Sequence, residues 1–153
     1  VPARLEVSFP NIFPKEKITI TDTNYWEWEG DWEKVIQTNQ WDGEEIQMQA
    51  ETVGSELTLK FNGTGAVIMG RFDIDCGQVD IFIDGKFHRS RDNYYKKMNW
   101  GAGDGWLNGA HLAHVMNLEK GNHELSIKIK NEKNEKSEGN KLKVARAIIY
   151  DEI

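Results

Sequence analysis

The sequence predicts an all-β protein, an antiparallel β-sandwich of the jelly-roll type. Apolar residues alternate with polar ones in several short runs, and glycine, asparagine and proline separate these runs. The chain has no long amphipathic helical pattern and no internal repeat. Asp84-Gly85 stands between two such runs and has the composition of a type I′ hairpin turn, in which both central residues take positive φ. These features predict roughly nine or ten short strands in two sheets.

Length and charge indicate one domain and a neutral or cationic ligand. The chain has 153 residues, a formal net charge of −6 and a pI near 5.3. We expect residues 1–153 to form a single β-sandwich domain, one module of a longer protein. Nucleic acids and anionic membranes favour basic partners, and no stretch reaches the ~20 apolar residues of a membrane span, so we expect neither a nucleic-acid partner nor membrane insertion. Cys76 is the only cysteine, which excludes an internal disulfide and a thiolate metal cluster.

The first 61 residues predict four strands and an aromatic segment. In order, the expected elements are a strand at 5–9, a turn between Pro10 and Pro14, a strand at 17–21, and two neighbouring antiparallel strands at 45–50 and 56–61. Trp26 and Trp28 stand at strand spacing within an acidic, tryptophan-rich segment. Large aromatic side chains are buried on average, so we expect both to face the core with their indole N–H groups hydrogen-bonded.

The rest of the chain supplies the predicted core. The expected elements are three strands within 61–89, a hairpin of 112–118 and 125–129 around Lys120-Gly121-Asn122, a mobile surface connection at 130–141, and a closing strand at 142–150. Alternation places these residues in the core: Val67, Met69, Val79, Ile81, Ile83, Leu125, Ile127 and Ile129.

The segment Ser90–Gly109 is the candidate ligand site. It is rich in glycine and too long for a simple connection. Aromatic faces can stack on sugars, while charged and amide groups direct hydrogen bonds to hydroxyls. The candidate ligand-binding residues are Tyr94, Tyr95, Trp100 and Trp106, with Arg71, Arg91 and Asp92 beside them.

Catalytic and metal chemistry find little support in the sequence. No serine lies in a nucleophile motif, and acidic pairs such as Asp73 and Asp75 more often cap turns than transfer protons. His111 and His114 would point to opposite faces of a strand, so we expect polar edge residues rather than zinc ligands. We expect no cofactor, although the acid-rich loops allow a structural calcium ion.

The order of four motifs resembles a known family. GTGAVIMG, DCGQVDIFIDGK, HLAHVMNLEKGNHELSIKI and KLKVARAIIYD follow one another between Leu57 and Asp151, with an aromatic segment among them. This order resembles the galactose-binding-like jelly-roll modules that accompany SGNH/GDSL-type esterases and other polysaccharide-degrading enzymes of bacteria. The resemblance implies a secreted, periplasmic or cell-surface protein whose partner is a carbohydrate or an adjacent catalytic domain.

Two functions therefore stay open. The first is a non-catalytic carbohydrate-binding module, which the aromatic and polar segment Ser90–Gly109 favours. The second is a structural or interaction domain attached to an SGNH-type esterase or other hydrolase, with no ligand of its own. Exposure of the aromatic side chains distinguishes the two. We expect no enzyme activity within this chain, whichever of the two functions it has.

Overall fold

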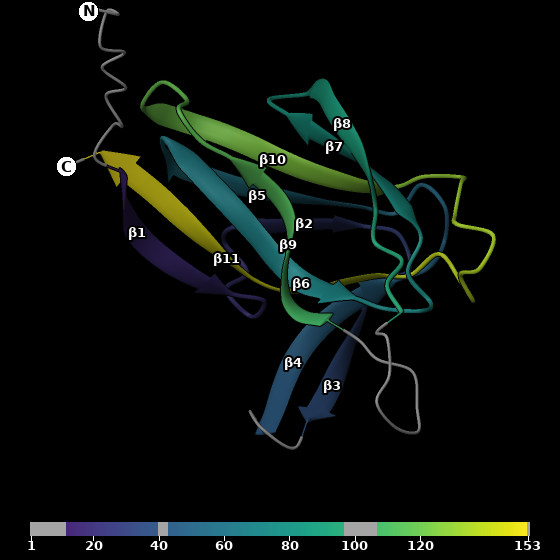
Figure 1. Cartoon of the computed structure of the whole chain (residues 1–153). Helices are drawn as coiled ribbons and strands as arrows, with labels where there is room; N and C mark the ends of the chain where they lie inside the picture. Colours follow the sequence, from purple (N-terminus) through teal and green to yellow (C-terminus); the bar gives the residue numbers. More distant parts are fainter. Residues whose placement is uncertain (1–11, 40–42, 97–106, 153) are drawn as a thin grey trace, which may run out of the picture.

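A computed structural model describes residues 12–39, 43–96 and 107–152, which form eleven strands (Figure 1). Six strands form one sheet: β1 (Ile12–Thr19), β3 (Glu33–Asn39), β4 (Gly43–Ala50), β6 (Gly65–Phe72), β9 (Leu107–Val115) and β11 (Leu142–Glu152). Five form the other: β2 (Trp26–Glu29), β5 (Glu56–Gly63), β7 (Gln78–Ile83), β8 (Lys86–Asp92) and β10 (Gly121–Ile129). The described residues contain no helix that could span a membrane.

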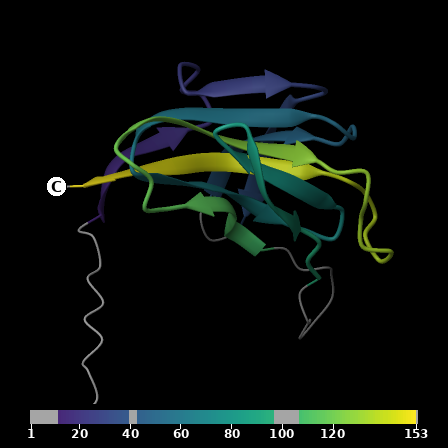
Figure 2. The ribbon, with the colours of Figure 1, turned by 90° about the horizontal axis from the view of Figure 1, so that it is seen from above.

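The two sheets stack as layers and confirm the predicted antiparallel sandwich (Figure 2). The six-stranded sheet has the order β3-β4-β11-β6-β9, with β1 paired to the far part of β11, and the five-stranded sheet has the order β2-β5-β10-β7-β8. All strand pairs are antiparallel. The long closing strand predicted at 142–150 therefore lies centrally, where it joins β1, β4 and β6 into one sheet.

The core lies between the sheets, and most of the predicted core residues occupy it. Val79, Ile81, Leu125, Ile127 and Ile129 are buried there, and Ile83 packs half-buried against them. On β6 the prediction is confirmed only in part: Val67 is buried, at 1% exposure, but Ala66 and Ile68 are the residues that face the opposite sheet, while Val67 and Met69 lie on the outer face. All four side chains are apolar, so alternation could not specify which pair faces inward.

The predicted turn is confirmed, and the prediction for the two tryptophans is confirmed in full for Trp26 only, since Trp28 makes no side-chain hydrogen bond within the described part of the chain. Asp84 has φ 50° and Gly85 has φ 78°, the positive values that a type I′ turn requires between β7 and β8. Trp26 is buried, and its indole N–H donates to the Thr19 carbonyl at 3.0 Å. Trp28 stacks on it with 5.4 Å between ring centroids and is half-buried at the edge of the core.

Two predicted hairpins do not form, because their strands lie in different sheets. β4 pairs with β3 and β11, whereas β5 pairs with β2 and β10. Likewise β9 pairs with β6, whereas β10 pairs with β5 and β7, so Lys120-Gly121-Asn122 begins a strand after a crossover instead of closing a hairpin. Alternation shows that a strand has one buried face, but it does not name the strand's partner.

Two connections also differ from expectation. Pro14 lies inside β1 at a register shift rather than ending a turn, which an edge strand tolerates because the missing N–H faces no neighbour. The segment 130–141 is anchored instead of being a free surface connection. Ser137 is 6% exposed, and its hydroxyl lies 2.7 Å from the Cys76 carbonyl and 2.8 Å from that of Gly139. The strand predicted at 5–9 lies outside the described residues.

Candidate ligand-binding face

Four strands of the six-stranded sheet bring polar side chains into one row on its outer face. Backbone register pairs Glu33 with Gln49, Gln49 with Lys143, and Lys143 with Arg71. Successive side chains of a strand point to opposite faces, so residues at alternate positions extend this row along β3 and β4. We call the resulting surface the polar face; it comprises Glu33, Gln37, Glu45, Gln47, Gln49, Arg71, Lys143 and Arg146.

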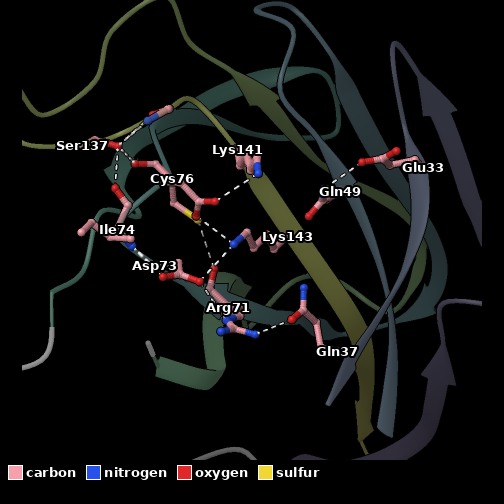
Figure 3. Close-up of polar contacts among 12 residues, drawn as sticks. Glu33, Gln37, Gln49, Arg71, Asp73, Ile74, Cys76, Ser137, Lys141 and Lys143 are labelled. Atoms are coloured by element: carbon pink, nitrogen blue, oxygen red, sulfur yellow. Dashed lines mark hydrogen bonds and ion pairs between the residues drawn. The ribbon is translucent and has the colours of Figure 1, made fainter. Parts of the chain in front are cut away.

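Direct contacts hold the groups of the polar face in place (Figure 3). Arg71 Nη1 donates to Gln37 Oε1 at 2.8 Å, and Gln49 Nε2 donates to Glu33 Oε1 at 2.8 Å. Arg146 Nη1 donates to Glu45 Oε1 at 3.0 Å. The first and third of these bonds join strands that are far apart in the sequence, and the second joins the neighbouring strands β3 and β4, so the amides, carboxylates and guanidinium groups keep fixed positions relative to one another.

A buried ion network supports one end of the polar face. Lys143 is only 5% exposed, and its Nζ lies 3.0 Å from Asp73 Oδ2 and 2.8 Å from Asp75 Oδ1. Arg71 Nε lies 3.0 Å from the same Asp73 oxygen, and Lys141 Nζ lies 3.2 Å from Asp75 Oδ2. Two cations thus flank each carboxylate, which offsets the cost of removing these charges from water.

The network also sets the ionisation of its members. Burial raises the pKa of Asp75, but hydrogen bonds and charges from Lys143 and Lys141 outweigh it and hold the pKa below its ordinary value. Burial raises the pKa of the neighbouring Cys76 thiol to about 12. Asp75 is therefore a carboxylate and Cys76 a protonated thiol at neutral pH. Neither residue is suited to nucleophilic or acid–base chemistry there.

A depression adjoins the polar face where β4 diverges from β1. Its volume is about 370 Å³, and Lys17, Thr19, Thr21 and Glu44 contribute polar groups to its lining. Glu45 and Arg146 belong both to this depression and to the polar face. The polar face therefore continues into a concave surface that a small ligand could enter.

The structure describes five of the candidate ligand-binding residues, namely Arg71, Arg91, Asp92, Tyr94 and Tyr95. Arg71 belongs to the polar face, whereas the backbone of Arg91 is in register with the buried Val79 of the other sheet. Arg91 on β8 donates to the His111 carbonyl at 2.9 Å and lies 5.5 Å from the centroid of the Phe72 ring. Asp92 is exposed and accepts the Tyr94 N–H at 2.9 Å.

Tyr94 and Tyr95 follow β8 and are half-buried beside Asp73, whose carbonyl accepts the Tyr95 N–H at 3.0 Å. The predicted loop Ser90–Gly109 is shorter than expected, because β8 continues to Asp92 and β9 begins at Leu107. Trp100 and Trp106 lie outside the described residues.

The two histidines of β9 share one face, contrary to expectation. A register shift opposite Ile68 and Met69 inserts an extra residue between His111 and His114, and their ring centroids lie 6.3 Å apart. Within the described ranges, no three His, Cys, Asp or Glu side chains are placed to hold a metal ion.

Sequence reasoning missed most of the polar face. No sequence motif singles out Gln37, Gln49 and Lys143, because glutamine and lysine are common on exposed strands. A signal did exist in the segment 45–49, where Glu45, Gln47 and Gln49 alternate with apolar residues. Such a pattern marks a polar strand face, but the register with β11 was needed to bring Lys143 beside it.

Comparisons with known proteins support the fold. No family model and no curated protein matches the sequence. A two-domain esterase active on acetylated mannans has a TM-score of 0.60 at 15% identity, over 92% of this chain and 37% of the esterase. A Paenibacillus xanthan lyase has a TM-score of 0.55 at 11% sequence identity, and the match covers 89% of this chain and 13% of the lyase. A family 35 carbohydrate-binding module from an environmental isolate has a TM-score of 0.50 at 11% sequence identity, and the match covers 88% of this chain and 91% of the module.

The shares of the matched chains differ in an informative way. This chain spans about a third or less of the esterase and the lyase, but nearly the whole of the carbohydrate-binding module. Identities this low carry information about the fold alone. In its fold, this chain is a galactose-binding-like jelly roll, which it shares with a carbohydrate-binding module and with parts of two polysaccharide-degrading enzymes.

Proposed function

We propose that this chain is a non-catalytic carbohydrate-binding module of a bacterial polysaccharide-processing protein, with its ligand on the polar face. The observation that carries the proposal is the set of planar hydrogen-bonding groups held together on the outer face of one sheet. Glu33 is exposed there and Gln37, Gln49 and Arg146 are partly exposed, while Gln47 and Lys143 are buried beneath them. Sugar hydroxyls both donate and accept hydrogen bonds. Amide side chains can satisfy both roles, while carboxylates accept and guanidinium groups donate.

The half-buried tyrosines beside Asp73 would complete this site. Tyr94 and Tyr95 lie close to Arg71 in the fold, since Asp73 joins them to the end of β6 through backbone hydrogen bonds. An aromatic ring supplies apolar area for the face of a sugar, which amides and charges cannot supply. Arg91 and Asp92 would stand at the rim. Trp100 and Trp106 belong to the same proposed site by their place in the sequence.

The chemistry of the described residues favours binding over catalysis. Asp73 and Asp75 are both paired with Lys143, and Lys143 helps to hold the pKa of Asp75 below its ordinary value, so Asp75 stays a carboxylate at neutral pH. A module of this kind would act outside the cell next to a hydrolase or esterase domain, in keeping with the enzymes that contain the same fold. The neighbouring domain, and not this chain, would then cleave the polysaccharide.

Calorimetric titration with mannan, xylan and xanthan oligosaccharides tests the proposal. We expect dissociation constants of about 0.1–1 mM, because a small polar site leaves little free energy after ordering costs. Gln49→Ala and Tyr95→Ala should each weaken binding about tenfold or more, as should Trp100→Ala and Trp106→Ala. Lys128→Ala, on the exposed face of the other sheet, is the control and should bind normally. Wild-type affinity in all the test variants, or no binding of any glycan, would overturn the proposal.

A structural role is the second candidate, and one surface favours it. Phe87 on β8 is 62% exposed, and its ring lies edge-on to Phe82 with 5.9 Å between centroids. An exposed aromatic side chain that packs on a half-buried one suits contact with another folded domain. If the chain fused to its neighbouring hydrolase binds no glycan, and Phe87→Ser loosens the two domains in limited proteolysis, the interaction role replaces the binding role.

A further inference from the structure

A second depression lies on the opposite side of the sandwich, over the five-stranded sheet. Its volume is about 750 Å³, which falls within the range of small-molecule sites in proteins. The residues that matter here are Asn24, Tyr25, Asn62, Asp84, Asn122 and His123. We call it the asparagine depression. It shares no residue with the polar face or with the depression beside it.

The walls of the asparagine depression are held by contacts from several strands. Asp84 Oδ2 lies 2.7 Å from His123 Nδ1, and Asp84 Oδ1 accepts the backbone N–H of Glu124 at 2.8 Å. Tyr25 is half-buried against the core, and its hydroxyl donates to Glu16 of the other sheet. The imidazole, the carboxylate and the phenol ring are therefore fixed before any ligand arrives, which lowers the entropy cost of binding.

The amide groups retain capacity for further hydrogen bonds. Asn62 Oδ1 accepts a hydrogen bond from Lys15 Nζ at 3.3 Å, and Asn62 Nδ2 donates to Asn122 Oδ1 at 3.0 Å, a bond that does not use the Nδ2 hydrogens of Asn122. Asn24 makes no side-chain hydrogen bond to another residue within the described part of the chain, and both Asn24 and Asn122 are exposed. Amide groups both donate and accept hydrogen bonds, and so do hydroxyl groups, so the two kinds of group can bind each other.

The charges of the asparagine depression disfavour an anionic ligand. Lys60 forms an ion pair with Glu27, and Asp84 is paired with His123. Each of these cations therefore already has an anionic neighbour, and Glu124 adds a further carboxylate to the lining, so the site does not select a phosphate. Fixed amides, one aromatic ring and carboxylates that accept hydrogen bonds together suit a neutral polyol.

From this geometry we infer that the asparagine depression is a second carbohydrate site, which binds a neutral oligosaccharide segment independently of the polar face. The inference takes its ligand class from the proposed function but uses different residues on the other sheet. Two sites on opposite faces would allow one module to bind two polysaccharide segments. Such bivalent binding raises the overall affinity of the module for a polymer above the affinity of either site alone.

Nuclear magnetic resonance of the ¹⁵N-labelled chain, titrated with mannopentaose and with xylopentaose to about 10 mM, separates the two sites. The side-chain amide signals of Asn24, Asn62 and Asn122 should shift, and calorimetry should give about two bound oligosaccharides per chain. The double variant Asn24→Ala, Asn122→Ala should lose these shifts and bind about one. Both positions are exposed, so the variant should keep its fold. Asn131→Ala, exposed beyond the far end of β10, is the matched control.

The outcomes distinguish this inference from the proposed function. Shifts of the asparagine signals support the second site whether or not the side-chain amide signals of Gln37 and Gln49 also shift. If the Gln37 and Gln49 signals do not shift, that result counts against ligand binding at the polar face. The inference is overturned if the three asparagine signals stay unmoved by both oligosaccharides. It is equally overturned if the double variant keeps the full stoichiometry of the wild type.

Discussion

Arg71 on β6 donates a 2.8 Å hydrogen bond to Gln37 on β3, although β4 and β11 lie between these strands. Lys143 lies between Arg71 and Gln49 in the backbone register, so Arg71 is level with Gln49. Gln37 is level with Glu45 instead, so Arg71 and Gln37 are also displaced along the strand direction. In a flat sheet their backbones would lie about 19 Å apart, further than the two side chains reach together. The sheet must therefore twist and curve, and Figure 1 shows β3 and β4 extending away from the body of the sandwich.

This contact predicts the behaviour of a Gln37→Ala variant. Loss of an acceptor for a charged donor should reduce the free energy of unfolding by about 1 kcal/mol, less than for a buried pair because Gln37 is half-exposed. It should also weaken the binding of any ligand to the polar face, since Arg71 loses one of the contacts that orient its guanidinium group. Urea unfolding measures the first effect. Thr38→Ala, at the exposed neighbouring position, should change neither property, and equal behaviour of the two variants would contradict the prediction.

The register of β6 predicts unequal effects of two adjacent substitutions. Ile68→Ala should lower the free energy of unfolding by about 2–5 kcal/mol, because it leaves a cavity between the sheets. Met69→Ala should cost clearly less, because Met69 is half-buried on the outer face. Ile81→Ala, in the opposite sheet, should resemble Ile68→Ala. Urea midpoints for the three variants test this, and a larger effect of Met69→Ala than of Ile68→Ala would reverse the assigned register.

The turn between β7 and β8 predicts a purely conformational effect at Gly85. A Cβ at this position would meet no atom within 4 Å, so only its φ of 78° resists substitution. Gly85→Val should therefore destabilise the domain by about 1–3 kcal/mol, whereas Gly85→Asn should cost much less because asparagine tolerates positive φ. Thermal unfolding compares the two variants. Equal melting temperatures for valine and asparagine would be inconsistent with a type I′ turn.

The buried ion network predicts a large difference between two lysines. Lys143→Met should reduce the free energy of unfolding by about 3–5 kcal/mol, because Asp73 and Asp75 lose their shared buried cation. The pKa of Asp75 should rise in this variant, which carbon-13 carboxyl shifts would report. Lys141→Met should cost less than about 1 kcal/mol, since that side chain is 30% exposed. A small effect of Lys143→Met would mean that water reaches the network.

The pair of Asp84 and His123 predicts how stability depends on pH. The pKa of His123 is raised by its hydrogen bond to the Glu119 carbonyl and by Asp84. Its contribution is fully present below the unfolded pKa of about 6.5 and is lost as pH rises through the raised folded value. Burial raises the pKa of Asp84, but the Glu124 N–H and His123 outweigh it and lower the pKa. The Asp84 contribution is present above its unfolded pKa and is lost as pH falls through the lowered folded value.

The pair should accordingly stabilise the protein most between about pH 4 and 6.5. His123→Gln should reduce stability at about pH 5.5 more than at about pH 8.5, which urea titrations at both values would measure. His88→Gln, on the exposed part of β8, is the control and should leave the pH profile unchanged. A uniform loss across the two pH values in His123→Gln would show that the imidazole acts by packing and not by charge.

Local patterns in the sequence determined the elements that depend on near neighbours. Alternation identified β7 and β10, and Asp84-Gly85 identified the turn, because strand period and turn conformation depend on a few consecutive residues. Trp26 was identified as a core residue for the same reason. The fold class followed from these elements together.

Tertiary structure alone decided which strands pair and which polar residues meet. The pairing of β11 with β1, β4 and β6 brings Lys143 between Gln49 and Arg71, although these residues are far apart in the chain. An extra residue in β9 places His111 and His114 on one face, and no local pattern marks that residue. The physical reason is that alternation specifies one buried face for each strand, while partner and register depend on how all the buried faces pack into one core.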